Sequence, residues 1–434
     1  MAIQAPRGTR DFYPDQMALR NWLFDAWRRV SLRCGFEEVD APAFESLELY
    51  TAKSGEGIVS ELFRMTDRGG RELALRPELT PSLARMVNQR AAALRLPIKW
   101  FAVPRLWRAE RPQAGRLREF FQWNIDIVGA EERLADAECI YVAVDLLREL
   151  GLGPGDVVVK ISSRPLLGAL LVEQGVPASV LGAAYALIDK RSKVPADKLT
   201  AMLGEALAAA GAADSADLAG RILEMAGCDD LDALPCAGSD SQRERADLQG
   251  LFALLGDFGV ADYCAFDLGT VRGLDYYTGP VFEVYDRQTR RRAIAGGGRY
   301  DSLLAALGGP RLAAVGFGMG DVVLIELLAD LGKLPTTTAS VDYFLIDADG
   351  ELLGRLLELA DGLRRRGASA VFSYRRATVS KQFKQAAQRG ARRAVVVGQE
   401  LARGRVTVKD LSTGRQVEIS LESLLNDPHQ PIDS

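Results

Sequence analysis

Residues 100–129 read WFAVPRLWRAERPQAGRLREFFQWNIDIVG, and this stretch decides the fold that we expect. Its second half alternates, so that one face of a predicted strand is apolar and the other is largely polar. The apolar face carries Phe121, Trp123, Ile125 and Ile127, and the other carries Phe120, Gln122, Asn124 and Asp126. Two amides and a carboxylate in a buried row are costly without a polar ligand. The stretch therefore predicts a sheet floor beneath a pocket for a polar small molecule.

An arginine-rich loop joins this strand to the extended run before it. Pro112 and Gly115 are typical of a long hairpin turn. Arg108 and Glu110 are expected to share a face of the first run. Four arginines crowd the loop: Arg108, Arg111, Arg116 and Arg118. Each guanidinium presents a rigid fork to phosphate oxygens, so we expect a mobile lid over a polyphosphate. The alternative is a surface hairpin with solvated arginines.

Composition and length limit the class of protein. A chain of 434 residues should hold two or three domains. No apolar run is long enough to span a membrane, and the first residues lack a signal region. Five scattered cysteines form no metal-ligand spacing and no obvious disulfide framework, which indicates reduced thiols in the cytoplasm.

The single histidine restricts the chemistry. His429 lies in a polar tail, so Ser-His-Asp and Cys-His catalysis and histidine-based metal sites are excluded. Chemistry must then depend on arginines, carboxylates and the backbone. The net charge of −4 argues against a nonspecific nucleic-acid binder, although local basic patches remain compatible with tRNA binding.

Three segments carry a resemblance to a known family. Residues 108–122 have the form Arg-x-Glu-Arg-Pro-Gln-x-Gly-Arg-x-Arg-Glu-Phe-x-Gln, which resembles motif 2 of the class II aminoacyl-tRNA synthetases. Residues 272–277, Arg-Gly-Leu-Asp-Tyr-Tyr, and 297–301, Gly-Gly-Arg-Tyr-Asp, resemble the two segments peculiar to histidyl-tRNA synthetases. A chance match of all three in this order is very improbable. The chain is therefore identified as a member of that family, and the resemblance covers nearly its whole length.

The resemblance extends to the other class II motifs. A helix over residues 16–34 and a strand at 36–39, followed by Pro42, resemble motif 1, which implies a homodimer. The alternative is an ordinary amphipathic helix on a core. Residues 63–80 predict a hairpin whose end, residues 76–80, resembles the family segment that holds the amino group of the amino acid. Thr80 and Pro81 also predict a helix start, with Thr80 as its N-cap.

Residues 311–331 resemble motif 3, a strand and a glycine-rich turn before a helix, but depart from it at one position. Val323 stands where the family usually has an arginine that packs on the adenine of ATP. Gly316, Gly318 and Gly320 still permit a close approach of a ligand. The adenine could instead stack on Phe120 and be held by Arg108. The departure also leaves open a paralogue that no longer activates an amino acid.

The resemblance assigns roles to particular side chains. Arg272 is expected to be catalytic, bridging the histidine carboxylate and the α-phosphate of ATP. The residues expected to bind ATP are Arg108, Glu110, Arg116, Arg118 and Phe120. The residues expected to bind histidine are Glu78, Thr80, Gln122, Asp126, Arg272, Tyr276, Tyr277 and Tyr300. Mg²⁺ is expected on the phosphates, largely in water, with no dedicated protein metal site.

The predicted fold is α+β in two domains. Residues 1–333 are expected to form the class II catalytic domain with its antiparallel sheet, including a helical insertion over about 164–250. Residues 334–340 are a predicted linker. Residues 341–434 predict a small α/β domain with a mostly parallel sheet, which resembles the anticodon-binding domain of class IIa synthetases. Its cations suggest an RNA footprint, or else a solvated face: Arg364, Arg365, Arg366, Arg375, Arg376, Lys381, Lys384, Arg389, Arg392 and Arg393.

The expected function is a cytoplasmic histidine–tRNA ligase, with L-histidine, ATP and tRNA(His) as partners and no membrane. A competing hypothesis is a non-catalytic paralogue that binds histidine and regulates ATP phosphoribosyltransferase. Val323 favours that hypothesis, whereas the C-terminal domain and the retained arginines argue against it. A third possibility is an RNA-binding protein built on an inactive synthetase, against which the intact histidine pocket argues.

Overall fold

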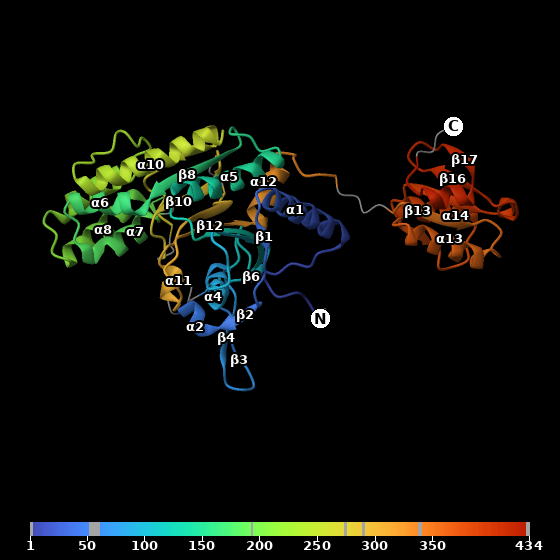
Figure 1. Cartoon of the computed structure of the whole chain (residues 1–434), viewed down its shortest axis with the longest axis horizontal. Helices are drawn as coiled ribbons and strands as arrows, with labels where there is room; N and C mark the ends of the chain where they lie inside the picture. The colour runs from blue at the N-terminus through green and yellow to red at the C-terminus, as the bar shows by residue number, and fades with distance from the viewer. Residues whose placement is uncertain are drawn as a thin grey trace. The chain divides into compact units, whose positions relative to one another are not determined.

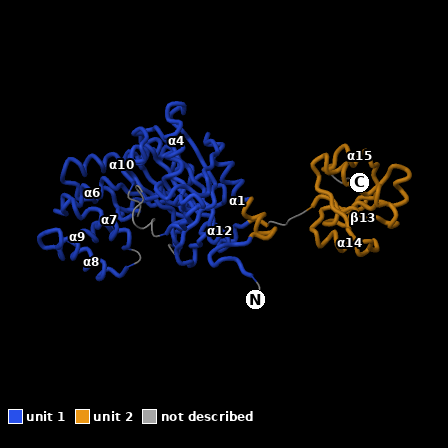
Figure 2. Tube along the Cα trace, turned by 90° about the horizontal axis from the view of Figure 1, so that it is seen from below, with its two compact units in different colours: residues 1–11, 22–334 blue, residues 12–21, 335–434 orange. Residues whose placement is uncertain are grey.

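The central sheet of the protein is built around β7 (Glu119–Val128), the strand predicted from its alternation. The computed structural model describes residues 3–51, 61–191, 194–272, 276–288, 291–336 and 341–430. The chain divides into two compact units, residues 1–11 with 22–334 and residues 12–21 with 335–434 (Figure 2). The predicted domain bounds remain a prediction, and residues 337–340 of the predicted linker lie outside the described residues.

Among the described residues, eight strands of the central sheet follow one path, and β6 pairs with β7 beside it. The order along the path is β1 (Glu37–Glu38), β5 (Ile98–Ala102), β7, β12 (Ala314–Gly320), β11 (Ala295–Arg299), β10 (Pro280–Asp286), β8 (Val157–Ser163) and β9 (Cys264–Phe266). Only the β1–β5 and β8–β9 pairings are parallel among these described strands. The predicted antiparallel sheet is thus confirmed at its centre (Figure 1).

The first extended run of the sequence is two short strands rather than one. β5 ends at Ala102, and β6 (Arg105–Trp107) begins after Pro104, which has no N–H for a strand ladder. Because β6 ends at Trp107, Arg108 and Glu110 lie in the loop and do not share a strand face as predicted. The loop closes where the N–H of Arg108 donates to the carbonyl of Arg118 at 2.9 Å.

The apolar face of β7 is covered by helices α1 (Pro14–Arg33), α5 (Arg133–Glu149) and α12 (Asp321–Asp330). Trp123 stacks on Trp27 of α1 with ring centroids 6.2 Å apart and meets Phe317 edge-on at 5.1 Å. Its indole N–H donates to Ser31 Oγ at 2.9 Å, so this fully buried ring keeps its hydrogen bond. This aromatic layer leaves the opposite face of β7 free for polar side chains.

Three described strands form a smaller, separate sheet. Its order is β2 (Phe44–Ser46), β4 (Glu72–Leu75), β3 (Arg64–Thr66), and it precedes α4 (Thr80–Arg90), which packs on α11 (Leu303–Ala306). Short helix α2 (Leu47–Thr51) packs beside it. The predicted N-cap is displaced by one residue, because Leu79 occupies that position and Thr80 is already helical, with Pro81 in the first turn.

Helices occupy most of the range predicted for the insertion, and the last of them continues beyond residue 250 to Asp257. Its elements are α6 (Arg164–Glu173), η1 (Ala178–Val180), α7 (Leu181–Ile188), α8 (Ala196–Ala209), α9 (Ser215–Met225) and α10 (Ser239–Asp257). The longest of them, α10, packs on α5, α6 and β8, so the insertion is joined to the outer part of the sheet (Figure 1). Short helix η2 (Ala261–Tyr263) then leads into β9.

In the described part of the second unit, five strands form one sheet. Its order is β14 (Ala370–Phe372), β13 (Tyr343–Asp347), β15 (Arg393–Val397), β16 (Arg405–Asp410), β17 (Gln416–Ser420). β14–β13–β15 are parallel but β15–β16–β17 are antiparallel, so the prediction of a mostly parallel sheet holds for only half of these pairings. Helices α13 (Leu353–Arg365) and α15 (Leu421–Asn426) cover one face and α14 (Val379–Gln388) the other. Short helix η3 (Gln399–Arg403) precedes β16.

Helices that could cross a lipid bilayer, judged by length and apolar character, do not occur in the described parts of the chain.

Candidate active site

The polar face of the central sheet has a floor made of glycines. On β12 and β11 the register places Gly316 opposite Gly298 and Gly318 opposite Gly296. A Cβ atom on any of these four glycines would collide with a neighbouring side chain or backbone atom. The missing side chains leave a recess that larger residues would fill.

Polar side chains from neighbouring segments lie over this floor. A Cβ on Gly316 would collide with the carboxylate of Asp126, and one on Gly318 with the amide of Gln122. A Cβ on Gly296 would collide with the guanidinium of Arg272. Three residues predicted for the site are therefore held over one glycine floor.

Asp126 is buried in this recess and only half satisfied. Tyr300 donates its hydroxyl to Asp126 Oδ1 at 2.5 Å, and Oδ2 has no hydrogen-bond partner among the described residues. Burial raises the pKa of Asp126 to about 7, although the Tyr300 hydroxyl acts in the opposite direction. The free oxygen is an acceptor, or when protonated a donor, for a polar ligand.

Glu78 is a second buried carboxylate with the same property. Tyr276 donates to its Oε2 at 2.9 Å, while Oε1 has no partner in the described chain. Burial raises the pKa of Glu78, and the charges of Arg108 and Arg272 oppose that rise. Tyr276 also lies with its ring centroid 5.9 Å from that of Tyr300, so the tyrosines join the two carboxylates.

Thr80 and Tyr277, two further residues predicted to bind histidine, are also buried near these groups. Thr80 opens α4 two residues after Glu78, as the predicted segment requires. Tyr277 packs against Tyr276 with ring centroids 5.0 Å apart, and its ring would be struck by a Cβ on Gly298. The predicted histidine-binding residues thus gather around the glycine floor.

Arg272 is held in an unusual backbone conformation. Its φ of 58° lies in the left-handed region, which a non-glycine residue adopts only when its surroundings impose it. Nη1 lies 3.3 Å from Glu283 Oε1, and the guanidinium lies 5.6 Å from the centre of the Tyr277 ring. Nε has no partner among the described residues. Gly273, Leu274 and Asp275 of the same predicted segment lie outside the described residues.

Glu283 is a site residue that the sequence analysis missed. It accepts from the Tyr285 hydroxyl at 2.5 Å and pairs with Arg272, so it fixes the guanidinium over the floor. The register of β10 places it opposite Gly296. An acidic residue that alternates with apolar ones in residues 281–285 was the available signal, but a solvated strand face gives the same pattern.

The arginine loop forms a second group of residues beside the floor. Arg108 donates from Nε to the carbonyl of Pro77 at 3.2 Å and lies 5.4 Å from the centre of the Phe120 ring. Arg118 donates from Nε to the carbonyl of Glu110 at 3.0 Å. Because Arg108 also influences the pKa of Glu78, the two groups of residues are electrostatically connected.

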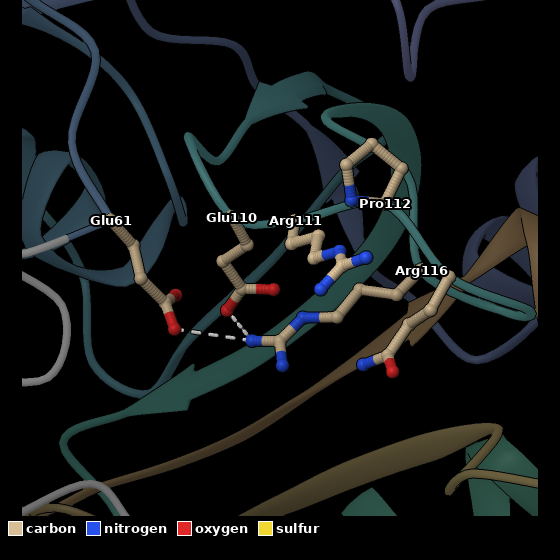
Figure 3. A pocket seen from close by; sticks show the side chains of 6 residues that line it. Glu61, Glu110, Arg111, Pro112 and Arg116 are labelled. Carbon is tan, nitrogen blue, oxygen red and sulfur yellow. Dashed lines mark hydrogen bonds and ion pairs between the residues drawn. The ribbon is translucent and has the colours of Figure 1, made fainter.

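Arg116 lies in a cavity of about 630 Å³ (Figure 3). Its guanidinium pairs with Glu61 at 3.1 Å and with Glu110. Burial, and then the neighbouring charge of Arg292, lowers the pKa of Arg116 to about 10, with a further contribution from Arg108. The residues that line the cavity are Glu61, Glu110, Arg111, Pro112, Gln113 and Arg116.

The N-terminal arm supports the base of this loop, a contact that the sequence analysis did not foresee. The carbonyl of Gly8 accepts from the N–H of Arg118 at 2.9 Å. Arg10 pairs at 2.7 Å with Asp321, the first residue of α12, which also accepts from the Phe121 N–H at 3.0 Å. The arm therefore connects the loop to the glycine-rich turn before α12.

Comparison with known families decides the identity. A family model described as histidyl-tRNA synthetase matches residues 8–321, and one described as anticodon binding domain matches residues 341–427. The chain belongs to the histidyl-tRNA synthetase family. Histidine–tRNA ligase, chloroplastic/mitochondrial, of Arabidopsis thaliana is 42% identical over 97% of this chain and 86% of the relative. Histidine–tRNA ligase of Haloarcula marismortui is 39% identical over 98% and 97%.

Solved structures of this family share the fold. The histidyl-tRNA synthetase from Nostoc sp. PCC 7120 matches with a TM-score of 0.80 at 24% identity, covering 98% of both chains. An ATP phosphoribosyltransferase regulatory subunit/histidyl-tRNA synthetase from Bacillus halodurans C matches with a TM-score of 0.70 at 22% identity, covering 85% of this chain and 92% of that one. At these identities the likeness shows the fold alone.

The cations of the C-terminal unit fall into two groups in this synthetase-family chain. Several are engaged in the structure, such as Arg364, which donates to the carbonyl of Ala370 at 2.7 Å, and Arg393, which donates to that of Gln430 at 2.8 Å. Others are exposed and make no ion pair with described residues; they form the α14 basic surface: Arg375, Arg376, Lys381, Lys384 and Arg389. Tyr374, 90% exposed, adjoins this surface.

Proposed function

We propose that this chain is a histidine–tRNA ligase. It would join histidine to ATP, giving histidyl-adenylate and pyrophosphate, and then pass the histidyl group to the 3′ end of tRNA(His) with release of AMP. Full-length identity of 39–42% to relatives named as such ligases supports the proposal. The structural observation that carries it is the pair of buried carboxylates, Asp126 and Glu78, each with one oxygen that lacks a hydrogen-bond partner in the described chain.

The pair matches the two ends of histidine. The ammonium group needs a carboxylate and a hydroxyl, which Glu78 and Thr80 supply. The imidazole carries an N–H that Asp126 can accept, and Gln122 and the tyrosines 276, 277 and 300 would surround the ring. A site built around a buried acceptor rejects isosteres that cannot donate to it, because the acceptor would then stay unpaired.

Activation needs positive charge more than a protein nucleophile. An oxygen of the histidine carboxylate attacks the α-phosphorus of ATP, the bond to the β-phosphate oxygen breaks, and pyrophosphate leaves with its electron pair. Both reactants are anionic, so a fixed cation that neutralises them lowers the barrier. Arg272, half-buried and oriented by Glu283, is the residue proposed for this role.

ATP is proposed to lie along the arginine loop. Arg108 and Phe120 would hold the adenine, and Arg116 and Arg118 the phosphates, with Glu110 beside them. Groups of three or more His, Cys, Asp or Glu side chains placed to hold a metal ion do not occur in the described ranges. Mg²⁺ would take phosphate oxygens and water, and the carboxylates that line the cavity, Glu61 and Glu110, have the oxygen chemistry that it prefers.

The C-terminal unit is proposed to bind tRNA through the α14 basic surface, since guanidinium and ammonium groups without protein partners suit a phosphate backbone. A homodimer formed through α1 and a cytoplasmic location are further proposals. The domain division at residues 333 and 341 is also a proposal; it is supported by the two family models, which end at residue 321 and begin at residue 341.

Histidine-dependent exchange of pyrophosphate into ATP tests the enzyme. Wild-type protein should catalyse exchange with histidine and with no other amino acid. Arg272→Ala should lower the exchange rate by about 100-fold or more, because it removes the cation proposed between the histidine carboxylate and the α-phosphate. Histidine binding by the wild type without any exchange would instead support the regulatory paralogue.

A further inference from the structure

Arg292 is an exposed cation that the proposed function has not used. It lies in the hairpin between β10 and β11 and makes no hydrogen bond or ion pair with any residue that the structure describes. A Cβ built on Gly115 at the tip of the arginine loop would lie 4.0 Å from Arg292 Cδ. The stem of Arg292 therefore reaches the tip of the arginine loop from the hairpin between β10 and β11.

Two residues of α12 meet the same point. The Gly115 Cβ position lies 3.2 Å from Val323 Cγ2 and 3.9 Å from Glu326 Oε2. Gly115 has a φ of 69°, a conformation that favours glycine. The absence of a side chain there also lets the loop tip approach α12 closely. The side chains of Arg292 and Val323 therefore both lie close to Gly115, and Arg292 provides a cation where α12 has an apolar residue.

Arginines from separate segments come close together near this point. After burial, the charge of Arg292 is the largest influence that lowers the pKa of Arg116, and Arg108 adds to it. Arg116 is balanced by Glu61 and Glu110, whereas Arg292 has no ion-pair partner in the described chain. Guanidiniums drawn from separate segments repel one another unless an anion lies between them.

We propose that Arg292 is a nucleotide-binding residue that, together with Arg116, holds the β- and γ-phosphates of ATP. The proposal rests on the proposed function, because it assumes that ATP occupies the arginine loop. Arg292 would then supply, from a neighbouring hairpin, the cation that α12 lacks at Val323. Since the β- and γ-phosphates leave as pyrophosphate, the same contact would also stabilise the charge of the leaving group.

Direct binding of nucleotides to the full chain tests this assignment without depending on activity. Arg292→Ala should weaken ATP binding by about 10- to 100-fold in calorimetry, the effect of losing one or two charge-assisted hydrogen bonds. Arg292→Lys should lie between, because lysine keeps the charge but not the fork. AMP and histidine should bind with unchanged affinity, since neither carries the β- or γ-phosphate.

The matched control is Arg311→Ala. Arg311 is also exposed, belongs to the same unit and has no partner in the described chain. It lies just before the first residue of β12, whereas α12 follows the last residue of that strand. Its removal should change ATP affinity by less than twofold. The proposal is overturned if Arg292→Ala binds ATP as tightly as this control, or if its affinity for AMP falls as much as for ATP.

The outcomes also separate this proposal from the function on which it rests. If wild-type protein shows no histidine-dependent exchange but Arg292→Ala still loses ATP affinity, the ligase proposal fails and the assignment of Arg292 stands. If exchange proceeds and its KM for ATP is the same in Arg292→Ala, the ligase stands and the assignment fails. Thermal unfolding of each variant confirms that a loss of affinity is not a loss of fold.

Discussion

Gly296 and Gly297 are neighbours in β11 whose missing side chains serve different purposes. A Cβ on Gly296 would collide with the guanidinium of Arg272, whereas one on Gly297 would collide with the carbonyl of Gly316 and with Phe317. The first glycine makes room for a side chain of the site, and the second allows two strands to pack. Function and stability should therefore separate between adjacent residues.

Replacing Gly296 by alanine should impair catalysis far more than folding. The new methyl group would displace the Arg272 guanidinium, so the rate of ATP–pyrophosphate exchange should fall by about 100-fold or more, as in Arg272→Ala. The melting temperature should change little, because the displaced group is the end of a flexible side chain.

Gly297→Ala should lower the melting temperature more than Gly296→Ala does, since a clash with backbone atoms cannot be relieved by a side-chain rotation. Gly155→Ala, at a glycine with open space around it, serves as the neutral control. Equal losses of stability in Gly296→Ala and Gly297→Ala would contradict this account.

The raised pKa of Asp126 makes stability depend on pH. An aspartate in the unfolded chain ionises near pH 4, but burial keeps Asp126 protonated up to about pH 7. The folded state therefore holds an extra proton between these values, and the free energy of unfolding should fall as pH rises through this window.

Asp126→Asn should remove that contribution. Relative to the variant, wild-type protein should lose up to about 4 kcal/mol of unfolding free energy between pH 4 and pH 7. Urea denaturation of both proteins at several pH values measures the difference, in which titrating groups that do not interact with Asp126 cancel. A difference that stays constant across this range would show that Asp126 ionises normally in the folded chain.

Among the elements, β11 and α5 are joined by a buried ion pair. Arg299 and Asp136 have side-chain exposures of 3% and 2% and meet at 2.7 Å. Arg299 also donates to the carbonyls of Ala130 and Glu132 at 3.1 and 3.3 Å, which ties the segment after β7 to the same strand. One guanidinium thus fixes the far end of the glycine floor.

Arg299→Leu should destabilise the chain by about 3 kcal/mol, because it leaves the buried carboxylate of Asp136 with Arg133, at 3.3 Å, in place of its shorter pair. The double variant Arg299→Leu/Asp136→Leu should recover part of this loss, since no charge then remains buried. Arg28→Ala, which breaks a half-exposed pair with Glu38, should cost less than about 1 kcal/mol. Urea denaturation measures the free energy of unfolding of all three variants. If Arg299→Leu loses no more of it than Arg28→Ala, the buried pair is dispensable.

The sequence predicted correctly those helices and strands whose apolar residues recur with a clear local period. The alternation in residues 119–128 gave both faces of β7, and helix α1 begins and ends within two residues of its prediction. The placement of Arg108 and Glu110 on a strand was wrong because the N–H of Ala109 bonds to the carbonyl of Glu61 instead of to β7. That partner is distant in the chain, and local propensity contains no information about it.

The site was predicted less completely than the fold, for a similar reason. Family motifs named the residues that gather over the floor, but Glu283 and Arg292 depend on register and on the approach of separate loops. A charged residue in a strand or a hairpin turn resembles any solvated surface position until its neighbours are known.

At the scale of the whole molecule, binding of tRNA and activation of histidine should be separable. The α14 basic surface belongs to a unit with its own buried cores on both faces of its sheet. The ten cations counted in the sequence reduce to these five because others are held by carbonyls or carboxylates of the same unit, as Arg393 is.

Charge reversal at Arg375 and Arg376 together should raise the KM for tRNA by about 10-fold or more at moderate salt. It should also make the affinity for tRNA less dependent on salt, since fewer counterions are released. ATP–pyrophosphate exchange, which needs no tRNA, should keep its rate. Unchanged aminoacylation kinetics would instead place the RNA contact on another surface.

The two half-satisfied carboxylates also bear on how long the protein survives in a cell. Each buried oxygen without a partner costs about 1–3 kcal/mol of stability, and a bound histidine would satisfy both Glu78 and Asp126. Occupied molecules should therefore open and be degraded more slowly than empty ones. Starvation for histidine would then shorten the half-life of the very molecules that use it, so the abundance of this protein would follow the supply of its amino acid.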